Sequence, residues 1–416
     1  MSFRIQRFAD FSYLLPTPTY AFKSSTNIFT QYDNICFYKI MSSSPEFAFQ
    51  VTLPPNKVRI SGETKLVEDR VRTFGKGLIF SKYQGSDGPF VPVGEGLPFQ
   101  RPDQMFEVAI KLAESGQIQL LSFSDRWPLE ASPGYEHDLV SFLHKFPATL
   151  VWEIGTMGFF DDLAKSDYYA DVLARVDHFV AVSEMIRKEA LRNGVTPDKI
   201  STIYPPIDTG LFSPVEKEAK SRVRAGLNLP QNDPIGIYVG RFDSHKGIDF
   251  LVKNWGKAGN LGHLLLLGSA TAEEQPYYDK LIAANPHVIY RGFVADSDLK
   301  ARYYQAADYL TFTSKSEGLS LMMMEAMSSG LPAVVYNGAV WTSDIGELFI
   351  EGETGYALNH LNASELNNAV HRIIRNRQFL SRRSREELLK LASDLPTTVA
   401  RLEVLYRNLI VARQRD

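Results

Sequence analysis

Short apolar runs alternate with amphipathic segments along most of the chain, and their spacing predicts strands that alternate with helices. Four helical patterns each precede a strand-like run between residues 103 and 204. These pairs are 103–115 with 118–123, 139–144 with 149–152, 168–175 with 178–182, and 185–193 with 200–204. Alternation of this kind is typical of a parallel sheet wound with helices.

A second α/β series begins after residue 234. Strands are predicted at 235–239, 263–267, 288–290, 309–313 and 333–336, and helices at 248–255, 298–307 and 320–328. This half therefore predicts a doubly wound sheet. The last forty residues carry a basic run at 382–385 and spaced leucines, which together predict charged amphipathic helices.

The boundary between the two series falls at a pair of prolines. Pro205 and Pro206 cannot continue a central strand or enter a helix, because each removes a donor and fixes φ. We expect an N-terminal Rossmann-like domain over 1–205, a C-terminal Rossmann-like domain over 206–395, and a C-terminal helix over 396–416 that is able to pack back on the N-terminal domain. The first hundred residues show strand-like runs at 35–38 and 47–53, but the pattern does not predict their order in a sheet.

Length, charge and cysteine content narrow the class of protein. A chain of 416 residues exceeds what one hydrophobic core usually serves, and a net charge of −3 gives no electrostatic case for binding nucleic acid. The single cysteine, Cys36, excludes an intrachain disulfide framework and fits a reducing compartment, so we expect a cytoplasmic protein. No apolar run reaches the length of about 18 residues that spans a bilayer, so any membrane contact is expected to be peripheral, at the inner face.

A turn between a predicted strand and a predicted helix carries the sequence GRFDSHKG at residues 240–247. In open α/β sheets, ligands bind at such turns. Gly240 permits a tight turn, the helix start attracts anions, and Arg241 and Lys246 add two positive charges. This pattern favours a diphosphate site; the alternative is a solvated surface loop.

Two acids eight residues apart form the second candidate feature. Glu317 lies in a predicted strand-to-helix turn and Glu325 inside the helix, at most about 12 Å further along the axis. One carboxylate is placed to hold a ribose and the other a hexose, while amides near Leu319 and Ser320 face phosphates between them. The alternative, that Glu325 only decorates the helix, is weakened by its apolar neighbours, among which an unpaired charge costs free energy.

Residues 179–358 resemble the GT4 family of glycosyltransferases, in which two Rossmann-like domains of the GT-B fold face each other across a cleft. The GR-x4-K signature of that family is matched by Arg241 and Lys246, and its E-x7-E signature by Glu317 and Glu325. The stretches 181–184, 204–208 and 291–293 resemble further family landmarks in the same order.

The resemblance implies a retaining hexosyltransferase that uses a nucleotide-sugar donor, with UDP-glucose the first choice, and a saccharide or glycolipid acceptor in polysaccharide or glycoconjugate assembly. Catalysis is assigned to Glu317, Arg241 and Lys246. The residues implied to bind the donor are Gly240, Arg241, Lys246, Arg291, Gly292, Phe293, Glu317, Gly318, Leu319, Ser320 and Glu325. The alternatives are a GDP-mannose-dependent mannosyltransferase, a GT-B epimerase or hydrolase of nucleotide sugars, and a non-catalytic sugar-nucleotide-binding protein.

The N-terminal half departs from the family pattern. Its nearest equivalent of the family's Gly-Gly loop is Gly94-Glu95-Gly96, and Glu153 stands near the position of the family's usual histidine. We therefore assign Gly94, Gly96 and Glu153 to the acceptor side, the alternative for Glu153 being a strand-end acid that faces solvent.

No metal or other cofactor is expected. Asp296 and Asp298 copy an Asp-x-Asp metal motif, but they directly precede a predicted helix, so an N-cap is the favoured interpretation. His137 and His144 share a helical face without the carboxylate or cysteine company of a metal site.

Overall fold

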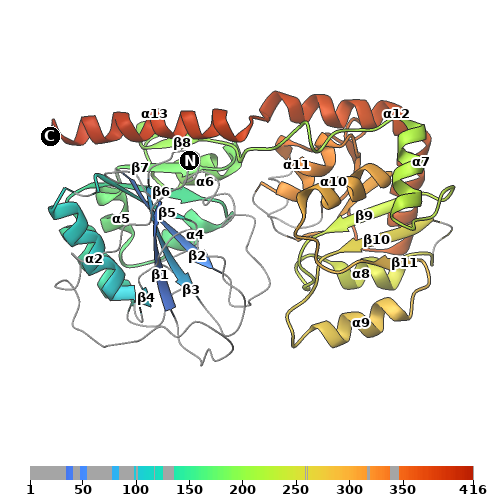
Figure 1. Cartoon of the computed structure of the whole chain (residues 1–416), viewed down its shortest axis with the longest axis horizontal. Coiled ribbons are helices and arrows are strands. Elements are labelled where there is room, and N and C mark those ends of the chain that lie inside the picture. The colour runs from blue at the N-terminus through green and yellow to red at the C-terminus, as the bar shows by residue number, and fades with distance from the viewer. Residues whose placement is uncertain are drawn as a thin grey trace, which may run out of the picture. The chain divides into compact units, whose positions relative to one another are not determined.

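The computed structural model describes residues 34–40, 47–53, 77–83, 98–99, 102–116, 118–124, 135–257, 259, 261–315, 319–337 and 346–415. Within these residues the strands form two sheets (Figure 1). One sheet has eight strands in the order β4-β1-β3-β2-β5-β6-β7-β8, and the other has six in the order β11-β10-β9-β12-β13-β14.

The N-terminal sheet is parallel from β3 to β8 but has an antiparallel edge. Its strands are β1 (Asn34–Ile40), β2 (Phe47–Leu53), β3 (Gly77–Tyr83), β4 (Pro98–Phe99), β5 (Leu120–Ser124), β6 (Thr149–Ile154), β7 (His178–Ala181) and β8 (Ile200–Thr202). Strand β1 pairs antiparallel with both β3 and β4, whereas β2 pairs parallel with β3 and β5. The predicted parallel winding is therefore confirmed for most of this sheet, and the antiparallel edge lies where the pattern did not predict an order.

The helices of this half follow the predicted alternation, with two exceptions. They are α2 (Pro102–Glu114), α3 (Tyr135–Lys145), α4 (Phe159–Leu163), α5 (Tyr169–Arg175) and α6 (Glu184–Arg192), with a short 3-10 helix, η1, at Pro197–Lys199. Of these, α4 and the short helix η1 were not predicted. Every residue of β6 is buried, which is typical of a strand in a parallel sheet that is covered on both faces.

The C-terminal sheet is parallel throughout and doubly wound, as predicted. Its strands are β9 (Ile235–Val239), β10 (His263–Leu267), β11 (Val288–Tyr290), β12 (Tyr309–Phe312), β13 (Ala333–Tyr336) and β14 (Gly355–Leu358). The strand order reverses between β9 and β12, which are neighbours in the sheet. In such folds the ligand crevice lies beyond the carboxyl ends of the strands at this reversal.

Helices cover both faces of this sheet. They are α7 (Lys217–Gly226), α8 (Ile248–Asn254), α9 (Gln275–Ala283), α10 (Ser297–Ala306), α11 (Leu321–Ser328) and α12 (Ala363–Leu391). Figure 1 shows α8 and α9 on one side of β9 to β11 and α10 and α11 on the other. The alternating side chains of β10 enter two cores: Leu264 and Leu266 pack with α8 and α9, whereas Leu265 and Leu267 pack with α10 and α11.

The last helix, α13 (Leu395–Arg413), contacts the N-terminal sheet. The Tyr406 hydroxyl donates a hydrogen bond to Glu153 Oε1 at 2.7 Å, and Arg413 Nη1 lies 2.8 Å from Asp177 Oδ1. None of the described helices combines the length and the apolar character that crossing a membrane requires.

The basic run at 382–385 lies on α12, and its arginines have partners within the C-terminal half. Arg382 lies 3.6 Å from Glu386, and Arg383 pairs with Glu353 at 2.5 Å. Arg385 donates to backbone carbonyls, among them that of Thr209 at 3.1 Å. Because neighbouring acids and carbonyls take up these charges, the run provides less positive field than its sequence suggests.

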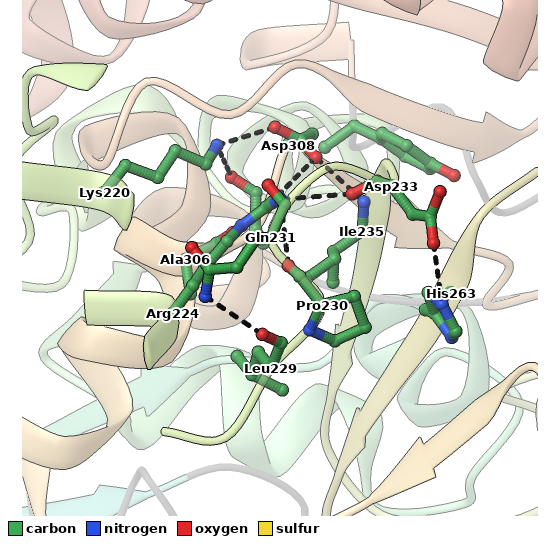
Figure 2. A network of polar contacts seen from close by, with 12 residues as sticks. Lys220, Arg224, Leu229, Pro230, Gln231, Asp233, Ile235, His263, Ala306 and Asp308 are labelled. Atoms are coloured by element: carbon green, nitrogen blue, oxygen red, sulfur yellow. Dashed lines mark hydrogen bonds and ion pairs between the residues drawn. The ribbon is translucent and has the colours of Figure 1, made fainter. Parts of the chain in front are cut away.

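A cluster of ion pairs lies at the amino end of β12. Asp308, directly before the strand, accepts from Lys220 at 2.7 Å, Arg224 at 2.7 Å, Arg377 at 2.6 Å and the Ile235 N–H at 2.8 Å. Figure 2 shows Lys220 and Arg224 converging on this carboxylate. The cluster thus ties α7, α12, β9 and β12 together and sets the register of the two strands at the reversal.

Candidate functional site

Hydrogen bonds join the first sequence motif to the segment directly before the second one, beyond the carboxyl ends of β9 and β12. The Lys315 N–H donates to the His245 carbonyl at 2.7 Å, and the Thr313 hydroxyl donates to the Lys246 carbonyl at 3.0 Å. Gly247 makes this approach possible, since its φ is +71° and a Cβ there would lie 2.7 Å from the Thr313 carbonyl oxygen. The loop with Arg241 and Lys246 therefore touches the segment that leads into the Glu317 turn.

Asp243 shapes the loop that carries the two cationic residues. Its Oδ1 accepts from the backbone N–H of His245 at 3.0 Å and from that of Lys246 at 2.9 Å, an arrangement typical of an Asx turn. Arg241 Nη2 lies 3.7 Å from Asp243 Oδ2, and the Arg241 side chain is 72% exposed. An exposed guanidinium with one long ion pair is accessible to an anionic ligand. Sequence reasoning did not single out Asp243, although an Asp in a turn is a recognisable signal.

Three glycines bring the ends of β9, β10 and β11 into backbone contact. The Gly268 N–H donates to the Gly292 carbonyl at 2.7 Å. A Cβ at Gly268, where φ is +145°, would lie 1.7 Å from the Gly240 carbonyl oxygen. Gly240 and Gly292, both predicted site residues, are thereby brought together through Gly268, which the sequence analysis did not assign.

The segment 291–293, which the resemblance implies to bind the donor, follows β11 at this edge. The Phe293 side chain is 43% exposed, so its ring is accessible to a planar ligand. Arg291 Nη2 lies 3.4 Å from the Asn228 carbonyl, so its guanidinium is directed towards that backbone.

Glu325 lies inside α11, as predicted, and has two partners on α10. Its Oε1 lies 2.5 Å from Lys300 Nζ, and its Oε2 accepts from the Tyr304 hydroxyl at 3.1 Å. Ser320 is the N-cap of α11 and its hydroxyl accepts from the Met323 N–H at 3.4 Å. Leu319 is buried in the core beside this helix start. The sequence did not predict Lys300 or Tyr304, because they precede Glu325 by more than twenty residues.

Four of the predicted site residues lie outside the described residues and stay predictions. They are Gly94, Gly96, Glu317 and Gly318. Glu153 is described: it is 6% exposed, and its Oε1 accepts from the Ser122 hydroxyl at 3.1 Å and the Tyr406 hydroxyl at 2.7 Å. The alternative of a solvent-facing acid is therefore wrong, while the assignment of Glu153 to the acceptor side stays a prediction.

The Asp-x-Asp sequence forms a helix cap. Asp296 Oδ1 accepts from the Leu299 N–H at 2.7 Å, so the predicted N-cap of α10 is confirmed. His144 does have a carboxylate partner, Asp171 at 3.0 Å, which the sequence analysis did not expect. Throughout the part of the chain that the structure describes, no three His, Cys, Asp or Glu side chains lie together as a potential metal site.

Comparison with known families places two stretches of the chain among glycosyltransferase domains. Residues 233–376 match the family described as "Glycosyl transferases group 1". Residues 125–211 match "Glycosyltransferase Family 4". The first stretch contains Arg241, Lys246, Glu317 and Glu325, and the second contains Glu153.

Among curated proteins, the chain is similar to D-inositol 3-phosphate glycosyltransferase from Corynebacterium glutamicum, with 28% identity over 45% of this chain and 44% of that protein. It is also similar to alpha-galactosylglucosyldiacylglycerol synthase from Streptococcus pneumoniae, with 23% identity over 51% of this chain and 56% of that protein. The chain thus spans about half the length of the curated relatives it matches.

Among solved structures, Anabaena Alr3699/HepE in complex with UDP aligns over 87% of this chain and 100% of its own, with a TM-score of 0.65 and 15% identity. The same protein has been crystallised with UDP-glucose. With its two Rossmann-like sheets, the chain has the GT-B fold.

Proposed function

We propose that the protein is a retaining glycosyltransferase that transfers a hexose from a UDP-sugar, with UDP-glucose the first choice, to a saccharide or glycolipid acceptor. The observation that carries the proposal is the hydrogen bond from the Lys315 N–H to the His245 carbonyl, at 2.7 Å. It joins the cationic loop after β9 to the segment that leads into the acidic turn after β12. This contact supports the proposal that one ligand contacts both motifs.

The diphosphate of the donor is assigned to the cationic loop. Arg241 and Lys246 provide two positive charges, and each charge-assisted hydrogen bond contributes about 1.5–3 kcal/mol. As the bond to the sugar breaks, negative charge grows on the leaving diphosphate, and fixed cations stabilise that charge without a metal ion. The proposal accordingly requires no metal cofactor.

The two acids of the second motif are assigned to the two sugars of the donor. Glu325 is proposed to hold the ribose and Glu317 to lie beside the transferring hexose, with the acceptor attacking from the face that the diphosphate leaves. This division is what the resemblance to the GT4 family implies, and the spacing of the two acids along the predicted turn and helix leaves room for both sugars.

Support for the donor and acceptor classes comes from the compared proteins. UDP and UDP-glucose are bound by the Anabaena protein, and the name of the Streptococcus pneumoniae enzyme describes a glycolipid synthase. Polysaccharide or glycoconjugate assembly in the cytoplasm, with peripheral contact at a membrane, belongs to the proposal. The basic run at 382–385 would be the obvious segment to contact an anionic membrane, but the pairing of Arg383 with Glu353 counts against that role.

Three rivals make different demands on the site. A mannosyltransferase would bind GDP-mannose in preference to UDP-sugars. An epimerase or hydrolase would release isomer or free sugar without an acceptor, and a binding protein would turn over no donor with any acceptor.

A thermal-shift screen of the full chain tests the proposal. UDP, GDP and ADP, each also as a hexose conjugate, are compared in excess EDTA and again with Mg²⁺ or Mn²⁺ in place of EDTA. A donor at a hundred times its dissociation constant should stabilise the fold by about 2.7 kcal/mol. We expect UDP and UDP-glucose to give the largest shifts. Stabilisation only by GDP compounds would reassign the donor, and stabilisation that requires Mg²⁺ or Mn²⁺ and is lost in Asp296→Ala would contradict the metal-free site.

A further inference from the structure

Both oxygens of the Glu325 carboxylate are held by side chains of α10. Lys300 Nζ lies 2.5 Å from Oε1, and the Tyr304 hydroxyl lies 3.1 Å from Oε2. The two side chains that donate these hydrogen bonds lie one helical turn apart on α10, so they approach the carboxylate from one side. This geometry fixes the orientation of the carboxylate as well as its position.

The carboxylate keeps room for a ligand. A carboxylate has about four lone-pair sites, two on each oxygen, and the two contacts use one on each. The Glu325 side chain is 13% exposed, so it is not sealed from solvent. The remaining sites, one on each oxygen, match the two donors of a vicinal diol.

Lys300 is itself held in place. Its ammonium lies 5.4 Å from the centroid of the Phe212 ring, and that ring packs against Tyr304 with their centroids 5.9 Å apart. Phe212 is buried and Tyr304 is fully buried. A lysine between an aromatic face and a carboxylate loses most of its usual freedom, which makes it suited to orienting its partner.

We infer that Lys300 is a positioning residue for recognition of the donor ribose: it orients Glu325 so that the carboxylate accepts both ribose hydroxyls. This inference rests on the proposed function, since it concerns the nucleotide that the chain is proposed to bind. Lys300 acts through Glu325 and does not contact the reacting atoms.

The competing interpretation is an ion pair that only stabilises the packing of α10 on α11. In that case, loss of Lys300 would weaken every nucleotide to the same degree, whether or not the nucleotide carries the ribose hydroxyls. The two interpretations therefore differ in how the substitution changes the ratio between the affinity for a nucleotide with the ribose hydroxyls and the affinity for one without them.

The test is calorimetric titration of the full chain with UDP and with 2′,3′-dideoxy-UDP, which lacks both hydroxyls. For the wild-type chain we expect UDP to bind about tenfold more tightly, as two hydrogen bonds to a charged group suggest. In Lys300→Met, UDP should weaken about tenfold while the dideoxy compound stays within twofold of its wild-type affinity. Lys300→Arg, which keeps the charge, should recover part of the preference. Lys253→Met, at a half-exposed lysine on α8, is the control and should change neither.

If Lys300→Met keeps the wild-type preference for UDP over the dideoxy compound, whether both affinities stay the same or fall equally, the inference is overturned and the proposed function is left intact. A wild-type chain that binds no nucleoside diphosphate would overturn the proposed function first. If Lys300→Met does not fold, Lys300→Gln gives the same comparison, because it retains a hydrogen-bond donor and removes the charge.

Discussion

His178 shows how burial of a single residue makes the stability of this chain depend on pH. It begins β7, it is 5% exposed, and its Nε2 lies 2.8 Å from the Ser201 hydroxyl. Burial lowers the pKa of His178 to about 4, against a weaker opposing effect of Asp198. The folded chain therefore holds this imidazole neutral, whereas the unfolded chain protonates it below its ordinary pKa of about 6.5.

The resulting prediction has a defined direction. The unfolded state binds the additional proton between about pH 6.5 and pH 4, so the contribution of His178 is complete above this window and is lost as the pH falls through it. We expect a loss of about 2 kcal/mol in the free energy of unfolding between pH 7 and pH 5. Urea denaturation at both values measures it, with His178→Gln as the comparison. A variant with the same pH dependence as the wild-type chain would contradict the prediction.

At the residue scale, the sequence identified side chains by their type and order but not their long-range partners. Arg241, Lys246 and Glu325 were predicted because they stand in recognisable spacings next to predicted helix starts. Lys300 could not be predicted, because its contact with Glu325 depends on how α10 packs against α11. Periodicity describes each helix separately and carries no information on that packing.

At the scale of elements, the Asp308 cluster determines how helices are fastened to the C-terminal sheet. Asp308 is 4% exposed, and Arg224, at 6% in its side chain, is buried with it. Arg224 also donates to the carbonyls of Ala306, Pro230, Gln231 and Asp233, so each of its guanidinium nitrogens has a partner (Figure 2). A buried ion pair with this many hydrogen bonds is costly to break from one side.

Asp308→Asn should accordingly destabilise the chain by about 3–5 kcal/mol, because it leaves the Arg224 charge buried without its counter-ion. The matched control is Arg377→Met, which removes a cation from the same carboxylate. The Arg377 side chain is 48% exposed, so we expect a loss of at most about 1 kcal/mol. Denaturation in urea measures both variants. Equal effects of the two substitutions would show that burial of the pair does not determine its contribution.

Most elements of the C-terminal half were predictable because their patterns are strong. The runs that form β9, β10, β11 and β13 are apolar and are bounded by turn residues, and their predicted bounds agree with the structure. Helices α7 and α9 and strand β14 were not predicted. The residues of α7 are mostly polar, so no continuous apolar stripe marks it, and β14 is a short run that contains Gly355. The antiparallel pairing of β1 with β3 could not be predicted from the sequence pattern, because the pattern marks a strand but does not identify its partner.

At the scale of the whole molecule, the order of the motifs along the chain helped to predict where they lie. In a doubly wound sheet, the position of a strand in the sequence constrains its position in the sheet. Two motifs that each follow a strand meet when those strands are neighbours, as β9 and β12 are. No sequence motif predicted the contact between Tyr406 and Glu153, which are 253 positions apart in the chain. The sequence thus carried a signal for the contact between the loop after β9 and the segment after β12, but none for the contact of Glu153 with α13.

Calorimetric titration with UDP in excess EDTA measures whether the loop after β9 binds the diphosphate of a nucleotide. The chains to compare are wild type, Arg241→Ala, Lys246→Ala and the control Lys253→Ala, which removes a lysine from the neighbouring α8. We expect each loop variant to bind UDP at least about tenfold more weakly, as the loss of a charged hydrogen bond implies, and the control to change by less than about twofold. Wild-type affinity in both loop variants, or no binding of UDP by the wild-type chain, would contradict this expectation.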